Sequence, residues 1–159
     1  MENILIPVDL SGTTPAVIAA AKDVARNRIA KLYLIHVASL AAPSVATEFG
    51  PIVSRDELAT TLRKEHRDVH VLATQLKSEG FDVNARLVPG DPIHQILREA
   101  DRLSAHVIVM GSHGHGALYH LLMGSTVTGV LRKAPCPVLV VPAKIANARV
   151  EPLSEASTG

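Results

Sequence analysis

The sequence predicts an α/β protein with one open, parallel, five-stranded sheet that carries helices on both faces. Short β-rich apolar runs alternate with longer stretches of helical periodicity, which is the pattern of βαβ units. The first run, Ile4–Val8, is apolar almost throughout, as expected for a strand that helices cover on both sides. The 159 residues, 47% hydrophobic and 19% charged, suffice for one domain with one core.

Capping signals indicate where the helices begin and end. Thr14 before Pro15 offers an N-cap and a first-turn proline, and Asp91 before Pro92 repeats that signal. Gly80 offers a left-handed cap at the end of a long amphipathic helix. The predicted strands cover residues 4–8, 32–37, 83–88, 106–110 and 137–141, and the predicted helices cover 14 to about 27, 55–80, 92–103 and 124 onward.

Two segments lack a clear period. Residues 38–54 contain two prolines and one glycine, which predicts a long loop of the kind that covers a ligand. Residues 143–159 lack apolar spacing and are interpreted as a flexible C-terminal tail.

Composition and charge exclude several classes of protein. Lys and Arg total 16 against 15 Asp and Glu, and aromatic residues are only 3%, so we expect no nucleic acid partner. The one cysteine, Cys136, cannot form an intrachain disulfide. The chain starts without a basic and then apolar leader, and no apolar run approaches the ~20 residues of a membrane helix. We therefore expect a cytoplasmic protein without a membrane partner.

A glycine-rich segment follows the fourth predicted strand and is the most informative part of the chain. Ligands of open α/β sheets bind beyond the carboxyl ends of the strands, and a helix that begins at Gly124-Ser125 directs its free N–H groups to that place. Glycines let backbone approach a phosphate, and the Ser125 and Thr126 hydroxyls add hydrogen bonds. The alternative is that the glycines only shape a loop. A Walker A loop is excluded because no Lys follows a glycine in this segment. A dinucleotide-binding fingerprint is excluded because it would follow the first strand, whereas this segment follows the fourth.

The spacing Gly111-x2-Gly114-x9-Gly124-Ser125 resembles the nucleotide-binding signature of the universal stress protein family, in its ATP-binding branch. Other segments agree in the same order, and the resemblance spans residues 2–142. These segments are Ile4-Leu5-Ile6-Pro7-Val8-Asp9, Leu34-Ile35-His36-Val37, Val88-x-Gly90-Asp91-Pro92-x3-Ile96 and Ala134-Pro135-Cys136-Pro137-Val138-Leu139-Val140-Val141.

The resemblance implies a Rossmann-like fold, similar to the adenine nucleotide alpha hydrolases, with strand order 3-2-1-4-5 in a domain of residues 1–142. It also implies that ATP binds at the carboxyl edge, with Mg²⁺. Asp9 and the Val37 backbone would contact adenosine, Gly111 and Gly114 would line the ribose and first phosphates, and the residues from Gly124 would hold the outer phosphates. The implied contacts are Pro7, Val8, Asp9, Val37, Met110, Gly111, Gly114, Gly124, Ser125 and Thr126. The roles of His113, His115 and Gly116 do not transfer from the family.

The function that follows is a nucleotide-dependent regulatory or stress-response protein. Without a P-loop Lys or a positioned carboxylate base, we expect ATP binding with little or slow turnover. The alternatives are a slow ATP hydrolase and a nucleotide-free interaction module. The final strand, 137–141, has no charge and lies at the edge of a sheet of that order, which predicts a homodimer through this strand. The alternative is a monomer whose tail folds over the edge.

Several polar residues have a structural interpretation beside the functional one. His66 and His70 have a zinc-binding spacing, but we expect a solvated helix face. Asp9 alone suits a turn or cap, and its place beside the crevice favours a ligand contact. His36 and His106 are expected in strands, packed and hydrogen-bonded, and Cys136 is expected to pack rather than to sense redox state.

Overall fold

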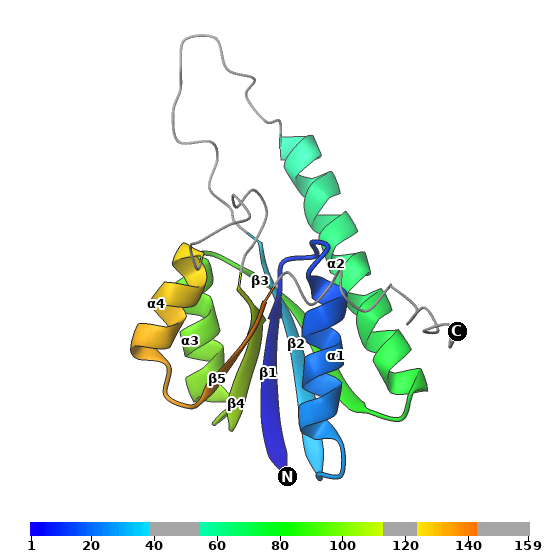
Figure 1. The fold of residues 1–159 in the computed structure, drawn as a ribbon. Coiled ribbons are helices and arrows are strands. Elements are labelled where there is room, and N and C mark those ends of the chain that lie inside the picture. The colour runs from blue at the N-terminus through cyan, green and yellow to red at the C-terminus, as the bar shows by residue number, and fades with distance from the viewer. Residues whose placement is uncertain (39–54, 113–123, 143–159) are drawn as a thin grey trace, which may run out of the picture.

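The computed structural model describes residues 1–38, 55–112 and 124–142 and contains a parallel sheet between two pairs of helices (Figure 1). Its elements are β1 (Glu2–Val8), α1 (Thr14–Ala25), β2 (Ala30–Ala38), α2 (Arg55–Ser78), β3 (Asp82–Pro89), α3 (Pro92–Arg102), β4 (Val107–Gly111), α4 (Ser125–Lys133) and β5 (Val138–Val141). The strand order is β3-β2-β1-β4-β5, with every pair parallel, which confirms the predicted sheet. The predictions for the loop from residue 39 to 54 and for the tail lie outside the described residues.

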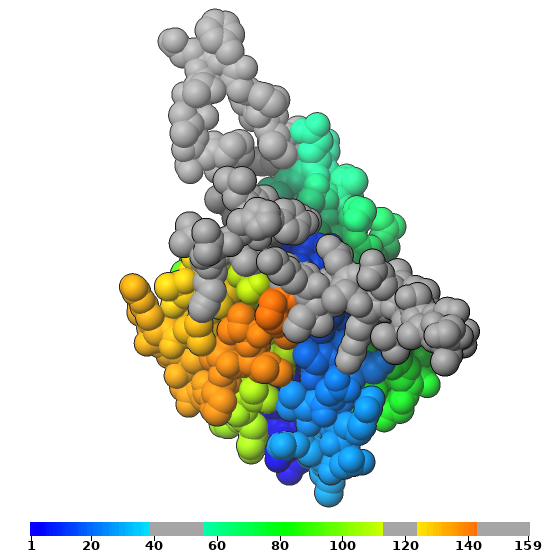
Figure 2. All heavy atoms as spheres, viewed as in Figure 1, coloured from blue at the N-terminus to red at the C-terminus, as the bar shows by residue number. Residues whose placement is uncertain are grey.

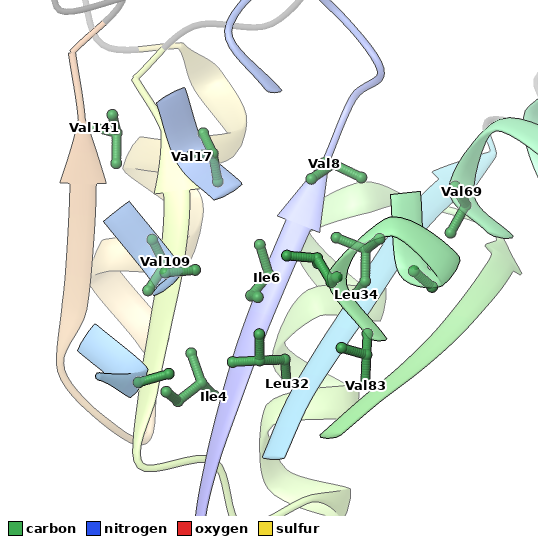
Figure 3. Packing of buried hydrophobic residues seen from close by; sticks show 14 residues of the cluster. Ile4, Ile6, Val8, Val17, Leu32, Leu34, Val69, Val83, Val109 and Val141 are labelled. Atoms are coloured by element: carbon green, nitrogen blue, oxygen red, sulfur yellow. The ribbon is translucent and has the colours of Figure 1, made fainter. Parts of the chain in front are cut away.

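The hydrophobic core has two parts because alternate side chains of a strand point to opposite faces of the sheet. On one face, Ile4 and Ile6 of β1 and Leu34 of β2 pack with Val17 of α1 and Val69 of α2 (Figure 3). On the other face the buried residues come from the sheet, α3 and α4, and include Leu5, Ile35, Ile96, Ile108 and Val130. Both faces of the sheet are thus covered, as the apolar run of β1 predicts.

The capping predictions differ in outcome. Asp91 caps α3 as expected, because its Oδ1 accepts a 2.9 Å hydrogen bond from the His94 N–H. Gly80 has φ +92°, the left-handed conformation expected after α2. The N-cap prediction for Thr14 is wrong by one residue: Thr13 precedes the helix, and its side chain makes no capping hydrogen bond. The helix also ends at Ala25 rather than near Asn27, whose φ of +63° is incompatible with a helix.

The two strand histidines also differ. His36 is 8% exposed and hydrogen-bonded, as predicted. His106 is exposed and precedes β4, so the expected strand position and burial are wrong. It is hydrogen-bonded nevertheless. Its ring Nδ1 accepts from the Asn3 backbone N–H at 3.2 Å, and its backbone N–H donates to the Asn3 carbonyl at 2.8 Å. In the described ranges no helix combines the length and apolar composition that a membrane crossing requires.

Candidate functional site

The carboxyl ends of the central strands meet at one edge of the sheet. In Figure 1 the strands run upward from the N-terminus, so this edge lies at the top. The β1 strand pairs with β2 on one side, with Val8 opposite His36, and with β4 on the other. The edge therefore gathers the predicted site residues of three strands, which are Pro7, Val8, Val37, Met110 and Gly111. Val8 and Met110 are buried, whereas the other three are half-buried.

The turn after β1 is held by the side chain of Asp9. Its Oδ1 accepts hydrogen bonds from the Ser11 N–H at 3.0 Å and from the Ser11 hydroxyl at 2.6 Å. The Ser11 hydroxyl also contacts Thr13 Oγ1 at 2.9 Å. Within this turn Leu10 has φ +60°, a conformation that is uncommon for a branched side chain and that needs such support. Asp9 therefore stabilises a turn, as its structural interpretation predicts, and this turn lies where the ligand contact was predicted.

Two backbone hydrogen bonds of Ser112, the residue after β4, join the end of β4 to β5 and to the start of α4. Ser112 donates its N–H to the Val141 carbonyl at 2.9 Å and accepts from the Gly124 N–H at 3.0 Å. Three predicted site residues, Gly124, Ser125 and Thr126, therefore begin α4 beside the end of β4. The first N–H groups of a helix have no partner within the helix and carry its positive dipole end, so this place suits an anion.

Gly124 has a backbone conformation that does not require glycine. Its φ is −56° and its ψ is 151°, an extended conformation that any residue adopts. Ser125, the next residue, is exposed, and Thr126 is half-buried. A glycine at the N-cap has no side chain to obstruct a phosphate that approaches the backbone, which is the role expected from the sequence.

Some of the predicted site lies outside the described residues, and some contacts were missed. Gly114, His113 and His115 belong to the segment 113–123, which is not described. Ser112 is 7% exposed and joins β4, β5 and α4, but no sequence signal distinguishes it from other serines after strands. Gly90 donates its N–H to the Ala38 carbonyl at 3.0 Å, and this contact joins β3 to β2 at the same edge.

The structure also describes the histidine pair on α2 and Cys136. His66 and His70 are exposed on α2, with ring centroids 4.3 Å apart. Within residues 1–38, 55–112 and 124–142, no group of three metal-binding side chains comes together. Cys136 is half-buried against the core that α3 and α4 share, and burial raises the pKa of its thiol, which opposes a redox-sensing thiolate.

Comparison with known proteins gives the family. The model of the universal stress protein family matches residues 1–142. The chain belongs to this family. The universal stress protein MJ0531 of Methanocaldococcus jannaschii is 30% identical over 142 residues, which cover 88% of this chain and 81% of that protein.

Solved structures of other proteins share the fold of this universal stress protein. The hypothetical protein MJ0577 of Methanocaldococcus jannaschii superposes with a TM-score of 0.74 at 30% identity, over 89% of this chain and 95% of that one. A universal stress protein from Archaeoglobus fulgidus, solved in complex with dAMP, superposes with a TM-score of 0.62 at 21% identity, over 88% and 97%.

Proposed function

We propose that this universal stress protein binds ATP at the carboxyl edge of its sheet and acts as a nucleotide-dependent regulatory protein in a stress response. The observation that carries the proposal is the Ser112–Gly124 hydrogen bond, which holds the start of α4 beside the end of β4. An anion at this place meets helix N–H groups and two hydroxyls, those of Ser125 and Thr126. The relative that was solved with dAMP supports an adenine nucleotide as the ligand class.

The proposed contacts divide between the two ends of the nucleotide. Asp9 and the Val37 backbone would contact adenosine, and Gly111 and Gly114 would line the ribose and first phosphates. Gly124, Ser125 and Thr126 would hold the outer phosphates. The described residues contain no cluster of three metal ligands, so Mg²⁺ would arrive with the phosphate oxygens and take a hydroxyl from the protein.

The charge distribution of α4 supports binding with little or slow hydrolysis. The basic residues of α4, Arg132 and Lys133, lie in its last turn, at the end opposite the proposed phosphate site. Phosphoryl transfer depends on positive charge around the γ-phosphate, and no described side chain of α4 supplies it there. A slow ATP hydrolase is the alternative, and a nucleotide-free interaction module is the second.

Two measurements separate these three functions. Equilibrium binding of labelled ATP, together with mass spectrometry of the denatured protein for co-purified nucleotide, tests the interaction module. A turnover assay with Asp9→Asn tests the hydrolase. We expect this variant to bind ATP more weakly and its residual rate to follow occupancy. A variant that binds as tightly as the wild type yet loses its rate would give Asp9 a catalytic role.

We further propose that two copies of the chain pair through β5. This strand ends the sheet order, and its Leu139 is 39% exposed. A groove of about 390 Å³ between α1 and β5 is lined by Ala16, Ala19, Ala20 and Leu139, among others. Figure 2 shows the atoms of α1 and β5 beside each other on the surface. An apolar strand edge next to an apolar groove favours a second copy, because antiparallel self-pairing closes as a two-fold dimer.

A further inference from the structure

A buried histidine joins two elements at the proposed nucleotide edge. His36 lies on β2 and shares the face of Leu32 and Leu34, which α2 covers. Its Nδ1 lies 2.8 Å from the Val8 carbonyl oxygen of β1, and its Nε2 lies 3.5 Å from Oε2 of Glu65 on α2. The ring thus stands between a carbonyl oxygen at hydrogen-bond distance and a carboxylate oxygen at ion-pair distance.

Only the charged form of the ring satisfies both contacts. A carbonyl oxygen accepts only, so Nδ1 must carry a proton to bond with Val8. A neutral ring with that proton directs the Nε2 lone pair at the Glu65 carboxylate, which is repulsive. The other neutral tautomer directs the Nδ1 lone pair at the Val8 carbonyl at 2.8 Å, which is worse. The imidazolium donates from Nδ1 to the Val8 carbonyl and forms an ion pair through Nε2 with the Glu65 carboxylate, so it is attracted to both oxygens.

The contact acts on two proposed adenosine contacts. The Val8 carbonyl belongs to the same planar peptide as the Asp9 N–H, so fixing the carbonyl fixes the direction in which the chain enters the Asp9 turn. Val37, the other proposed adenosine contact, directly follows His36. We propose that protonated His36 is a positioning residue, which links Glu65 to the Val8 carbonyl and strengthens ATP binding at this edge as the pH falls. This inference rests on the proposed function.

Other charged groups near the ring do not replace Glu65. On β1, the Asp9 carboxylate is engaged by Ser11. On α2, Lys64 is mostly exposed and pairs with Asp68 at 2.7 Å. On β3, the register partner of His36 is the apolar Leu87. On α1, the charged residues are Lys22, which pairs with Glu79, and Asp23, which pairs with Arg26.

The first experiment reads the ring in the nucleotide-free protein by nitrogen and carbon NMR between about pH 5.5 and 8, where histidine titrates. We expect protons on both ring nitrogens at the acid end and a proton retained on Nδ1 at the basic end. The Val8 carbonyl carbon should shift with the same midpoint. A ring that stays neutral throughout, or a neutral ring that carries its proton on Nε2, would overturn the bridge.

The second experiment compares ATP dissociation constants at about pH 6 and 8 in four proteins. We expect the wild type to bind about fivefold more weakly at the higher pH. His36→Asn keeps a donor for the Val8 carbonyl but cannot titrate, so it should lose this dependence. The amide of Glu65→Gln can donate to Nε2 of the neutral ring, so this variant should also lose the pH dependence of ATP binding. The exposed control, His66→Asn on the same helix as Glu65, should keep it.

The ATP phosphate also titrates in this range, so each variant is read as its ratio to the wild type at the same pH. The same ratio for His36→Asn at both pH values would overturn the proposal. His36→Leu, which removes both contacts, should bind weakly at both. No ATP binding by the wild type at any pH would overturn the proposed function and the coupling with it, whereas the nucleotide-free spectra would still decide the bridge.

Discussion

The carboxylate of Glu99 on α3 accepts hydrogen bonds at 3.0 and 2.6 Å from the guanidinium of Arg102, three residues further along the same helix. Glu99 is only 1% exposed, and Arg86 of β3 adds a third contact to the same oxygen at 3.3 Å. The hydrogen bond raises the pKa of Arg102, whose guanidinium is charged at any working pH. A buried carboxylate of this kind is tolerated because it is paired, so the stability of the fold depends on its partners.

We expect Arg102→Ala to lower the free energy of unfolding by about 1–2 kcal/mol, because it leaves Glu99 buried with the weaker of its two partners. The loss stays in that range because the Arg102 side chain is 48% exposed and solvent screens the pair. Urea denaturation measures it. Arg98→Ala, exposed on the same helix, is the control and should change stability by less than about 0.5 kcal/mol. Adding Glu99→Leu to Arg102→Ala should recover stability, and no recovery would contradict this account.

Three glycine-to-alanine changes should separate backbone strain from steric contact. Gly80 has φ +92° and open space around an added Cβ, so Gly80→Ala should cost about 1 kcal/mol. Gly90 has φ +133°, and its Cβ would lie 2.7 Å from Nε2 of the buried Gln95, so Gly90→Ala should cost about 2 kcal/mol. Gly12→Ala meets neither obstacle and is the control. Thermal unfolding measures the loss of stability. An equal loss at all three positions would show that backbone strain and steric contact do not determine it.

Gly124→Val should block ATP binding and leave the nucleotide-free fold intact. Its extended backbone accepts a β-branched residue, and we expect the new side chain to stand where a ligand approaches the start of α4. ATP should raise the melting temperature of the wild type by mass action and leave that of the variant unchanged. Lys133→Val, at the other end of α4, is the control and should respond like the wild type. An equal response from all three proteins would remove Gly124 from the site.

Leu139→Lys should convert a dimer into a monomer in analytical ultracentrifugation while ATP binding persists. The change places a charge on the exposed edge strand and beside the α1–β5 groove, where self-pairing would bury it. Leu58→Lys on α2 is a matched control, because Leu58 is 36% exposed and lies away from that edge. The dimer would be refuted by a wild-type protein that sediments as a monomer at working concentrations.

Cys136 should react with iodoacetamide several-fold more slowly in the folded protein than in the guanidinium-unfolded chain near neutral pH. Burial, with a smaller effect from the Asp101 charge, raises the pKa of the thiol and lowers its thiolate fraction. Because the fold favours the neutral thiol, Cys136 contributes to the free energy of unfolding in full at pH values below the pKa of the unfolded state. This contribution is lost as the pH rises through the pKa of the folded state. Identical alkylation rates in both states would contradict the raised pKa.

Local signals in the sequence identified the elements, and they were less reliable for exact ends. The Asp91 cap was predictable because its hydrogen bond reaches only three residues along the chain, to His94. Thr14 carries the same signal before Pro15, yet the helix takes it as its first residue. The turn formed by Asp9 and Ser11 lies directly before this helix, and Ser104, with a φ of +46°, lies in a turn before His106 and β4.

The sequence by itself determined the order of strands and helices, the two-sided burial of the sheet and the glycine spacing of the candidate site. These depend on periodicity and on contacts between near neighbours, which the chain carries locally. Only the tertiary structure decided that His36 caps the Val8 carbonyl, that Ser112 holds Gly124, and that buried Glu99 of α3 also contacts Arg86 of β3. The first and the last of these join residues of different strands and helices. A histidine or glutamate in an amphipathic pattern can be exposed to solvent or buried. Which of the two occurs depends on the element that packs against it.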